Sequence, residues 1–261
     1  VYDPFKNLKL SANISTGFRL PNVDDIGKIF DSEPGAVVVP NPSLKAENAY
    51  SFDWGLGYMF KKKVRLDASV YYTYLNNAMV RRDYTLNGAD SILYSGELSK
   101  VQAVQNAAQA TVYGFQIGIE AKINHAFSFS TRFSYQDGIE VLENGTKDRP
   151  RHTAPWFGIS SLNYSYKKLL LSAYSQYNGG FSAENLPLGE AAKDYLYAMD
   201  ENDMPYLPAW ITYNFRLRYR LGDYISFSGG IENLLDLRYR PYSSGLTAPG
   251  RNFHLAAKIS F

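Results

Sequence analysis

Residues 252–261, NFHLAAKISF, alternate strictly between two kinds of side chain. Successive side chains of a β-strand point to opposite faces of the sheet. One face of this stretch would be apolar: Phe253, Leu255, Ala257, Ile259 and Phe261. The other would be mostly polar: Asn252, His254, Ala256, Lys258 and Ser260. The same alternation recurs along nearly the whole chain, with many aromatic residues in the apolar set. We therefore predict an all-β fold.

Composition narrows the class of all-β protein. The chain has 261 residues, of which 15% are aromatic, and 22 of them are Tyr. Tyr suits the bilayer interface, where membrane β-barrels carry aromatic girdles. No apolar run approaches the roughly 18 residues that a membrane helix needs, and in lipid only helices and closed barrels satisfy every backbone polar group. The sequence thus favours an antiparallel transmembrane β-barrel. The formal net charge of +2 gives no reason to expect a nucleic-acid partner.

The alternation predicts about ten strands. They are expected near residues 7–17, 50–60, 64–74, 113–123, 127–135, 156–166, 169–178, 211–221, 225–232 and 252–261. Short connections near residues 61, 124, 167 and 222 would all lie at one end. Long connections would lie at the other end, at residues 18–49, 86–99, 141–154, 182–208 and 233–249. Outer-membrane barrels have this layout, with short periplasmic turns and long extracellular loops. A soluble β-sandwich is the alternative, but its turns would come every 8–12 residues.

Five short segments, together with the final aromatic residue, carry a family resemblance. They are residues 17–21 (GFRLP), 41–47 (NPSLKAE), 149–155 (RPRHTAP), 229–239 (GGIENLLDLRY) and 248–253 (APGRNF). In this order and spacing, the chain resembles the C-terminal part of TonB-dependent outer-membrane receptors of the siderophore and haem branch. The resemblance extends over essentially the whole chain.

The resemblance implies a 22-stranded barrel with a plug domain folded inside it. Residues 1–261 would be the C-terminal portion of that barrel, without the plug domain and the N-terminal strands. The implied partners are TonB, acting through a plug that this chain lacks, the remaining barrel strands, a lipid bilayer with lipopolysaccharide, and a bulky nutrient ligand. The implied location is the bacterial outer membrane. Because the chain begins at Val1 without a signal peptide, we expect a chain that is mature, trimmed or missing a large N-terminal part. A narrow closed barrel of ten strands is the structural alternative.

The implied function is TonB-dependent active uptake of a bulky nutrient, with an iron chelate, a siderophore or haem, as the leading hypothesis. This chain would supply barrel wall and extracellular ligand-binding loops. The segment between the first two boxes contains no His, which argues against haem ligation from that loop. Two alternatives stay open: a passive porin-like small barrel, and a structural half-barrel within a larger outer-membrane assembly.

Candidate site residues fall into three groups. Loop residues predicted to contact a ligand are Arg19, Asp24, Asp25 and Asp31, although a solvated acidic loop is the alternative. Residues predicted to face the lumen are Arg216, Arg218, Arg220 and Glu232, since an Arg facing lipid would cost roughly 2–4 kcal/mol at the midplane. These Arg side chains would contact the plug or steer anionic chelates, or else pair with carboxylates such as Glu232. Phe253 and Phe261 are predicted to form a C-terminal insertion signal.

No catalytic constellation is recognisable. The chain has no Cys, no G-x-S-x-G elbow and no two His at metal-ligand spacing. We therefore expect a protein that is not an enzyme, with no cofactor and no metal site.

Overall fold

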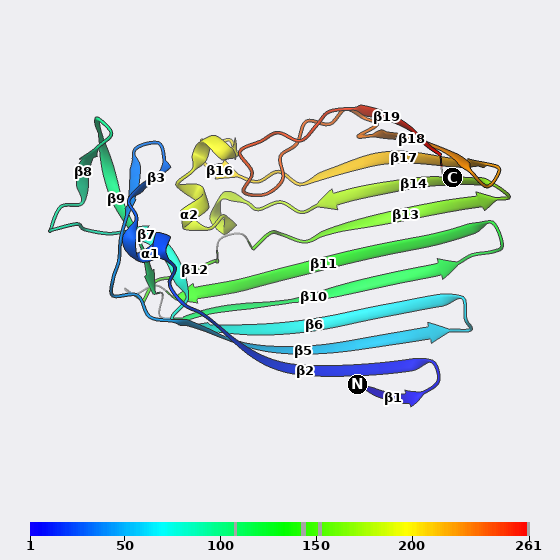
Figure 1. Cartoon of the computed structure of the whole chain (residues 1–261), viewed down its shortest axis with the longest axis horizontal. Coiled ribbons are helices and arrows are strands. Elements are labelled where there is room, and N and C mark those ends of the chain that lie inside the picture. Colours follow the sequence, from blue (N-terminus) through cyan, green and yellow to red (C-terminus); the bar gives the residue numbers. More distant parts are fainter. Residues whose placement is uncertain (107–108, 142–144, 151–152, 260–261) are drawn as a thin grey trace.

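The computed structural model describes residues 1–106, 109–141, 145–150 and 153–259. Its main feature is a 12-stranded antiparallel sheet in which neighbours follow chain order (Figure 1). Along the sheet lie β1 (Tyr2–Phe5), β2 (Leu8–Arg19), β5 (Glu47–Phe60), β6 (Val64–Asn76), β10 (Gln109–Lys122), β11 (Phe127–Val141), β13 (Phe157–Tyr166), β14 (Leu169–Asn178), β17 (Trp210–Leu221), β18 (Ile225–Glu232) and β19 (Asn252–Ile259). The twelfth strand, β12 (Lys147–Asp148), pairs with β11.

All ten predicted strands are present in this sheet, and β1 is an additional strand that the alternation did not predict. The sheet is open within the described residues: β1 pairs only with β2, β19 pairs only with β18, and the two do not pair with each other. The chain is therefore part of a barrel wall. The structure is therefore not the narrow closed barrel that was the alternative, because β1 and β19 do not pair in the described part of the chain.

The tight turns lie together at one end of the sheet, on the right of Figure 1, and the long connections lie at the other. At the first tight turn, the Lys63 backbone N–H donates to the Phe60 carbonyl at 2.9 Å. Lys61 and Lys62 both adopt positive φ there, at 46° and 55°. Positive φ at both central residues gives a turn whose twist matches that of the flanking strands. We refer to these two ends as the turn end and the loop end.

The strand register separates apolar from polar side chains as the alternation predicts. Phe115 on β10, for example, lies opposite Val70 on β6 and Tyr135 on β11. One position along, Gln116 lies opposite Ser69 and Ser134. Most of the sheet therefore has one apolar face and one polar face, and β13 departs from the pattern, because its Phe157 and Ile159 lie opposite Ser134 and Arg132 on the polar face.

Part of the loop end is a second sheet, which we call the loop sheet. Its strands are β3 (Phe30–Glu33), β4 (Ala36–Val39), β9 (Glu97–Asn106), β7 (Met79–Asp83) and β8 (Ser91–Tyr94). The short helix α1 (Val23–Gly27) precedes it. Val37, Val39, Val101 and Ala103 form its core and are fully buried. The connections predicted at residues 18–49 and 86–99 are therefore not irregular loops: they contain strands that the alternation did not predict, and β4 pairs in parallel with residues 100–103 of β9.

The connection between β14 and β17 has its own small core. It contains η1 (Ala183–Asn185), α2 (Leu188–Ala191), η2 (Asp194–Leu196), β15 (Ala198–Met199) and β16 (Pro205–Tyr206). Phe181, Leu186 and Leu207 are buried there, and Tyr242 from the β18–β19 connection packs against them. Among the described residues, no helix has both the length and the apolar character needed to cross a membrane.

Candidate functional site

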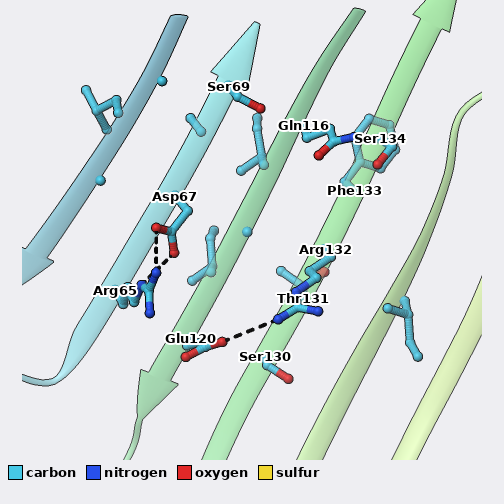
Figure 2. A pocket seen from close by; sticks show the side chains of 18 of the residues that line it. Arg65, Asp67, Ser69, Gln116, Glu120, Ser130, Thr131, Arg132, Phe133 and Ser134 are labelled. Carbon is cyan, nitrogen blue, oxygen red and sulfur yellow. Dashed lines mark hydrogen bonds and ion pairs between the residues drawn. The ribbon is translucent and has the colours of Figure 1, made fainter. Parts of the chain in front are cut away.

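The polar face of the sheet carries a cavity of about 700 Å³ over β5, β6, β10 and β11 (Figure 2). Two ion pairs lie in it: Arg65 Nε is 2.7 Å from Asp67 Oδ2, and Arg132 Nη2 is 3.8 Å from Glu120 Oε1. Both pairs are well exposed, so they contribute little to stability. Their effect is to give this face alternating charge suited to a polar partner.

Arg216 and Glu232, predicted from the sequence, meet on the polar face. Arg216 Nη2 is 2.9 Å from Glu232 Oε1, and the Tyr174 hydroxyl donates to the same oxygen at 3.2 Å. The guanidinium of Arg216 also lies over the Tyr174 ring, 4.6 Å from its centroid. The sequence left open whether Arg216 contacts a plug, steers a chelate or pairs with a carboxylate. In the structure it pairs with the carboxylate of Glu232.

Arg218 and Arg220 lie on the same face of β17 as Arg216, toward the turn end. Both are exposed, and neither makes an ion pair within the part of the chain that the structure describes. Their positive charge is thus available to a partner on this face, and the predicted contact with a plug or an anionic chelate stays a prediction.

The predicted ligand contacts at the loop end lie around α1, and two of them hold this helix in place. The Asp25 carboxylate is buried and accepts from the Asn22 backbone N–H at 3.0 Å, while the Asn22 side chain accepts from the Asp25 N–H at 2.9 Å. Arg19 pairs with Asp25 at 3.2 Å. Such a reciprocal capping box fixes a helix start. Asp25 and Arg19 therefore have structural contacts, and ligand binding by them stays a prediction.

The other two predicted ligand contacts, Asp24 and Asp31, are more exposed than Asp25. Asp24 is exposed and lies 3.5 Å from Lys28, one helical turn on. Asp31, on β3, is also exposed. No group of three or more His, Cys, Asp or Glu in the described residues is placed to hold a metal ion.

Asn41 is the first residue of the NPSLKAE box, and its side chain links β9 of the loop sheet to the turn that follows Asn41. It is buried, its side-chain N–H donates to the Val104 carbonyl at 2.8 Å, and its oxygen accepts from the Ser43 hydroxyl at 2.6 Å. An ion pair between Arg82 of β7 and the buried Glu140 of β11 ties the loop sheet to the barrel wall. The loop sheet is therefore anchored to the strands rather than free.

The two C-terminal boxes contact each other. The Asp236 carboxylate accepts from the Arg251 backbone N–H at 2.7 Å, and Arg251 Nε donates to the Leu234 carbonyl at 2.9 Å. A Cβ at Gly250 would lie 2.6 Å from Asp236 Oδ1, so a side chain there would force the Asp236 carboxylate to move. These contacts close the connection between β18 and β19 at the loop end.

Phe253, half of the predicted insertion signal, lies on the apolar face of β19 and is 68% exposed. The other half, Phe261, lies outside the described residues, as do Arg151 and His152 of the RPRHTAP box. An insertion role for Phe253 and Phe261 stays a prediction.

The alternation did not predict a second cavity at the loop end, of about 390 Å³, between the β14–β17 and β18–β19 connections. Its lining includes Tyr195, Tyr197, Trp210, Arg238 and Tyr239. The clustering of aromatic and Arg residues near 195–197 and 238–240 was visible in the sequence, but nothing local indicated that the two segments meet.

An open antiparallel sheet with one apolar face, one polar face and long ordered connections at a single end defines a segment of β-barrel wall. The chain belongs to the family described as TonB dependent receptor-like, beta-barrel, whose model matches residues 1–234. The family resemblance inferred from the sequence is thereby confirmed.

Two curated relatives are similar to the chain. The "Probable hemoglobin and hemoglobin-haptoglobin-binding protein 4" of Haemophilus influenzae is 24% identical over 310 residues, covering 100% of this chain and 28% of that protein. The "Hemoglobin-haptoglobin utilization protein B" of Neisseria meningitidis is 28% identical over 192 residues, covering 65% of this chain and 23% of that protein. The chain thus spans about a quarter of the length of these relatives.

Solved structures share the fold. The "Copper transporter OprC" superposes with a TM-score of 0.74 at 16% identity, covering 100% of this chain and 38% of that chain. A ferric enterobactin receptor (PfeA) of Pseudomonas aeruginosa superposes with a TM-score of 0.71 at 17% identity, covering 100% of this chain and 39% of that chain. At these identities, the likeness establishes the fold alone.

Proposed function

We propose that this chain forms part of the wall and outer loops of a TonB-dependent receptor that takes up a bulky iron chelate across a bacterial outer membrane. The observation that carries the proposal is the division of one long-stranded sheet into an exposed apolar face and a charged face. In a membrane barrel the apolar face meets lipid and the polar face lines the interior. A large apolar face left open to water would otherwise be a liability.

Aromatic pairs on the apolar face support this orientation. Near the loop end, the rings of Tyr50 and Tyr74 are 6.4 Å apart and those of Phe133 and Trp156 are 6.0 Å apart. Near the turn end, the ring centroids of Phe127 and Tyr164 are 4.9 Å apart. Two aromatic groups at opposite ends of the strands correspond to the girdles at the two interfaces of a membrane barrel. The turn end would then be periplasmic and the loop end extracellular.

The polar face would enclose a plug domain that this chain does not contain. Arg218, Arg220 and the ion pairs of Figure 2 supply charge on that face for the plug or for an anionic chelate passing it. TonB, acting on the plug, would drive the transport. The remaining strands of the barrel would pair with the open edges of β1 and β19, since in lipid every backbone polar group needs a partner.

An iron source as the ligand is favoured by the names of the two curated relatives, both of which refer to haemoglobin and haptoglobin. The test is growth of the source bacterium under iron limitation, with haemin, haemoglobin or a ferric siderophore as the only iron source. Deleting the receptor should abolish growth on one of these sources, and deleting TonB should do the same. Uptake that persists without TonB would instead indicate a passive pore.

The mass of the intact polypeptide, purified from outer membranes under denaturing conditions, tests the domain organisation. A species of more than twice the 29.4 kDa of this chain would agree with a plug and further strands on the same polypeptide. A species near the mass of this chain would contradict that arrangement, and transport would then need a separate plug-bearing protein.

A further inference from the structure

Two of the tight turns at the turn end consist entirely of lysine. They are residues 61–63, between β5 and β6, and residues 167–168, between β13 and β14. All five side chains are exposed. Within the part of the chain that the structure describes, none of the five makes an ion pair, whereas Lys28 and Lys100 at the loop end each pair with an Asp. These two turns therefore carry uncompensated positive charge.

The two turns also share a sequence pattern. Residues 58–62 read YMFKK and residues 164–168 read YSYKK, so each pair of lysines follows two aromatic residues with one residue between them. The second aromatic residue of each pattern lies on the apolar face, where Phe60 is 48% exposed and Tyr166 is 54% exposed. Each lysine turn thus begins directly beside an exposed ring of the apolar face.

The first lysine of each turn lies over that ring. Lys61 Nζ is 5.3 Å from the centroid of the Phe60 ring, and Lys167 Nζ is 5.4 Å from the centroid of the Tyr166 ring. An ammonium group within about 6 Å of a ring face is attracted to it. Both lysines adopt positive φ, at 46° and 52°. Two ammonium groups are therefore held at the apolar face of the sheet.

The last lysine of each turn lies on the opposite face. Lys63 directly precedes Val64, and Lys168 directly precedes Leu169, and both of these apolar residues lie on the apolar face. Because successive side chains alternate, the two lysines belong to the polar face. Lys63 contributes there to the lining of a cavity of about 460 Å³, beside Arg65. Each turn thus places one lysine at either face.

The position of the first lysines matches a bilayer interface. In the orientation proposed above, the apolar face meets lipid, and its aromatic rings near the turn end lie at the level of the headgroups. Lys61 and Lys167 would then extend along that face with their charge among the headgroups. Basic residues at a membrane surface attract anionic lipids. A zwitterionic headgroup is a poorer partner, because its own cation competes for the phosphate.

We propose that Lys61 and Lys167 form two binding sites for anionic phospholipid headgroups, in the leaflet at the turn end. Each ammonium group would bind the phosphate of one lipid, and the ring of Phe60 or Tyr166 would pack against the start of its acyl chains. Only the β10–β11 turn lies between the two lysine turns, so the sites are roughly 20 Å apart at the usual spacing of strands. The inference goes beyond nutrient uptake, and it rests on the orientation of the wall in the membrane.

The test is native mass spectrometry of the complete receptor in detergent, titrated with phosphatidylglycerol, which is anionic, or with phosphatidylcholine, which is zwitterionic. The receptor should bind phosphatidylglycerol more tightly, and added salt should weaken this preference. Lys61→Gln/Lys167→Gln keeps the length of both side chains and removes their charge. It should weaken binding of two phosphatidylglycerol molecules roughly fivefold each, as expected for one basic residue per headgroup, and leave phosphatidylcholine binding unchanged.

Lys63→Gln/Lys168→Gln is the matched control, because it removes the same charge from the same two turns on the polar face. It should retain the preference for phosphatidylglycerol. Equal losses in the two double variants would overturn the inference, and so would a receptor without a preference. A loss in the control alone would also overturn it, and would point instead to an acidic protein that docks on the basic turns from the periplasm. A lipid preference at Lys61 and Lys167 in a receptor whose iron uptake is independent of TonB would support this inference and refute the proposed function.

Discussion

Asn233 shows how one side chain closes a loop on the barrel. It is buried, its side-chain oxygen accepts from the Leu237 N–H at 2.9 Å, and its side-chain N–H donates to the Leu237 carbonyl at 2.8 Å. Its φ of 50° is one that Asn tolerates better than Ala. Asn233→Ala should therefore destabilise the receptor by about 1–3 kcal/mol, measured as a lower Tm and faster proteolysis of residues 233–251. Asn13→Ala, at an exposed position with one 3.5 Å contact to Asp53, should have no such effect. Equal behaviour of the two variants would contradict this account.

The residues of the candidate site differ in how far the sequence alone predicts them. The meeting of Arg216 and Glu232 followed from strand parity, because two inward residues on adjacent strands become neighbours once the register is set. The role of Asp25 did not follow from its acidity. The spacing of Asn22 and Asp25 was a readable capping signal, but the salt bridge from Arg19 depends on how the chain leaves β2.

At the scale of a strand, β17 tests which face meets lipid. Leu217 lies on the apolar face near the middle of β17, opposite Leu171 of β14 and Gly229 of β18. Leu217→Arg should cost about 2–4 kcal/mol if that position is near the bilayer midplane, and folding into lipid vesicles would measure the loss. Gln116→Arg, on the polar face of β10, is the control and should fold normally. Equal penalties would mean that the two faces are not divided between lipid and lumen.

The packing of the loop sheet can be tested at two residues of β9. Val101 of β9 is 0% exposed in the core of the loop sheet, whereas Leu98 of the same strand is 74% exposed. Val101→Asp would bury an unpaired charge, so it should open the loop sheet to proteases while the barrel strands stay protected. Leu98→Asp should leave the protease pattern unchanged. Cleavage within residues 77–106 in both variants would argue that the loop sheet is not a packed unit.

Strands of the wall were predictable because each pairs with the next one along the chain, so local alternation and turn length fix both partner and register. The loop sheet was not, because β4 and β9 pair in parallel although about 60 residues separate them. Its core strand β4, AVVV, is apolar at every position, so it lacks the period-two signal. The cavity of about 390 Å³ at the loop end could not be predicted either, since its two walls come from the β14–β17 and β18–β19 connections, which are far apart in the sequence.

At the scale of the whole molecule, the open edges of β1 and β19 set the last prediction. Backbone N–H and C=O groups along an unpaired edge have no partner in lipid, and each one costs several kcal/mol. Residues 1–261 produced alone should therefore fail to insert as a monomer into vesicles, and should instead associate through their edges. Electrophoresis with and without heating, together with the mass of the detergent complex, would show this, and the complete receptor serves as the control. A heat-modifiable monomer of 29.4 kDa that conducts ions would mean that β1 and β19 can close on each other. The passive small barrel would then replace the receptor wall as the better account of this chain.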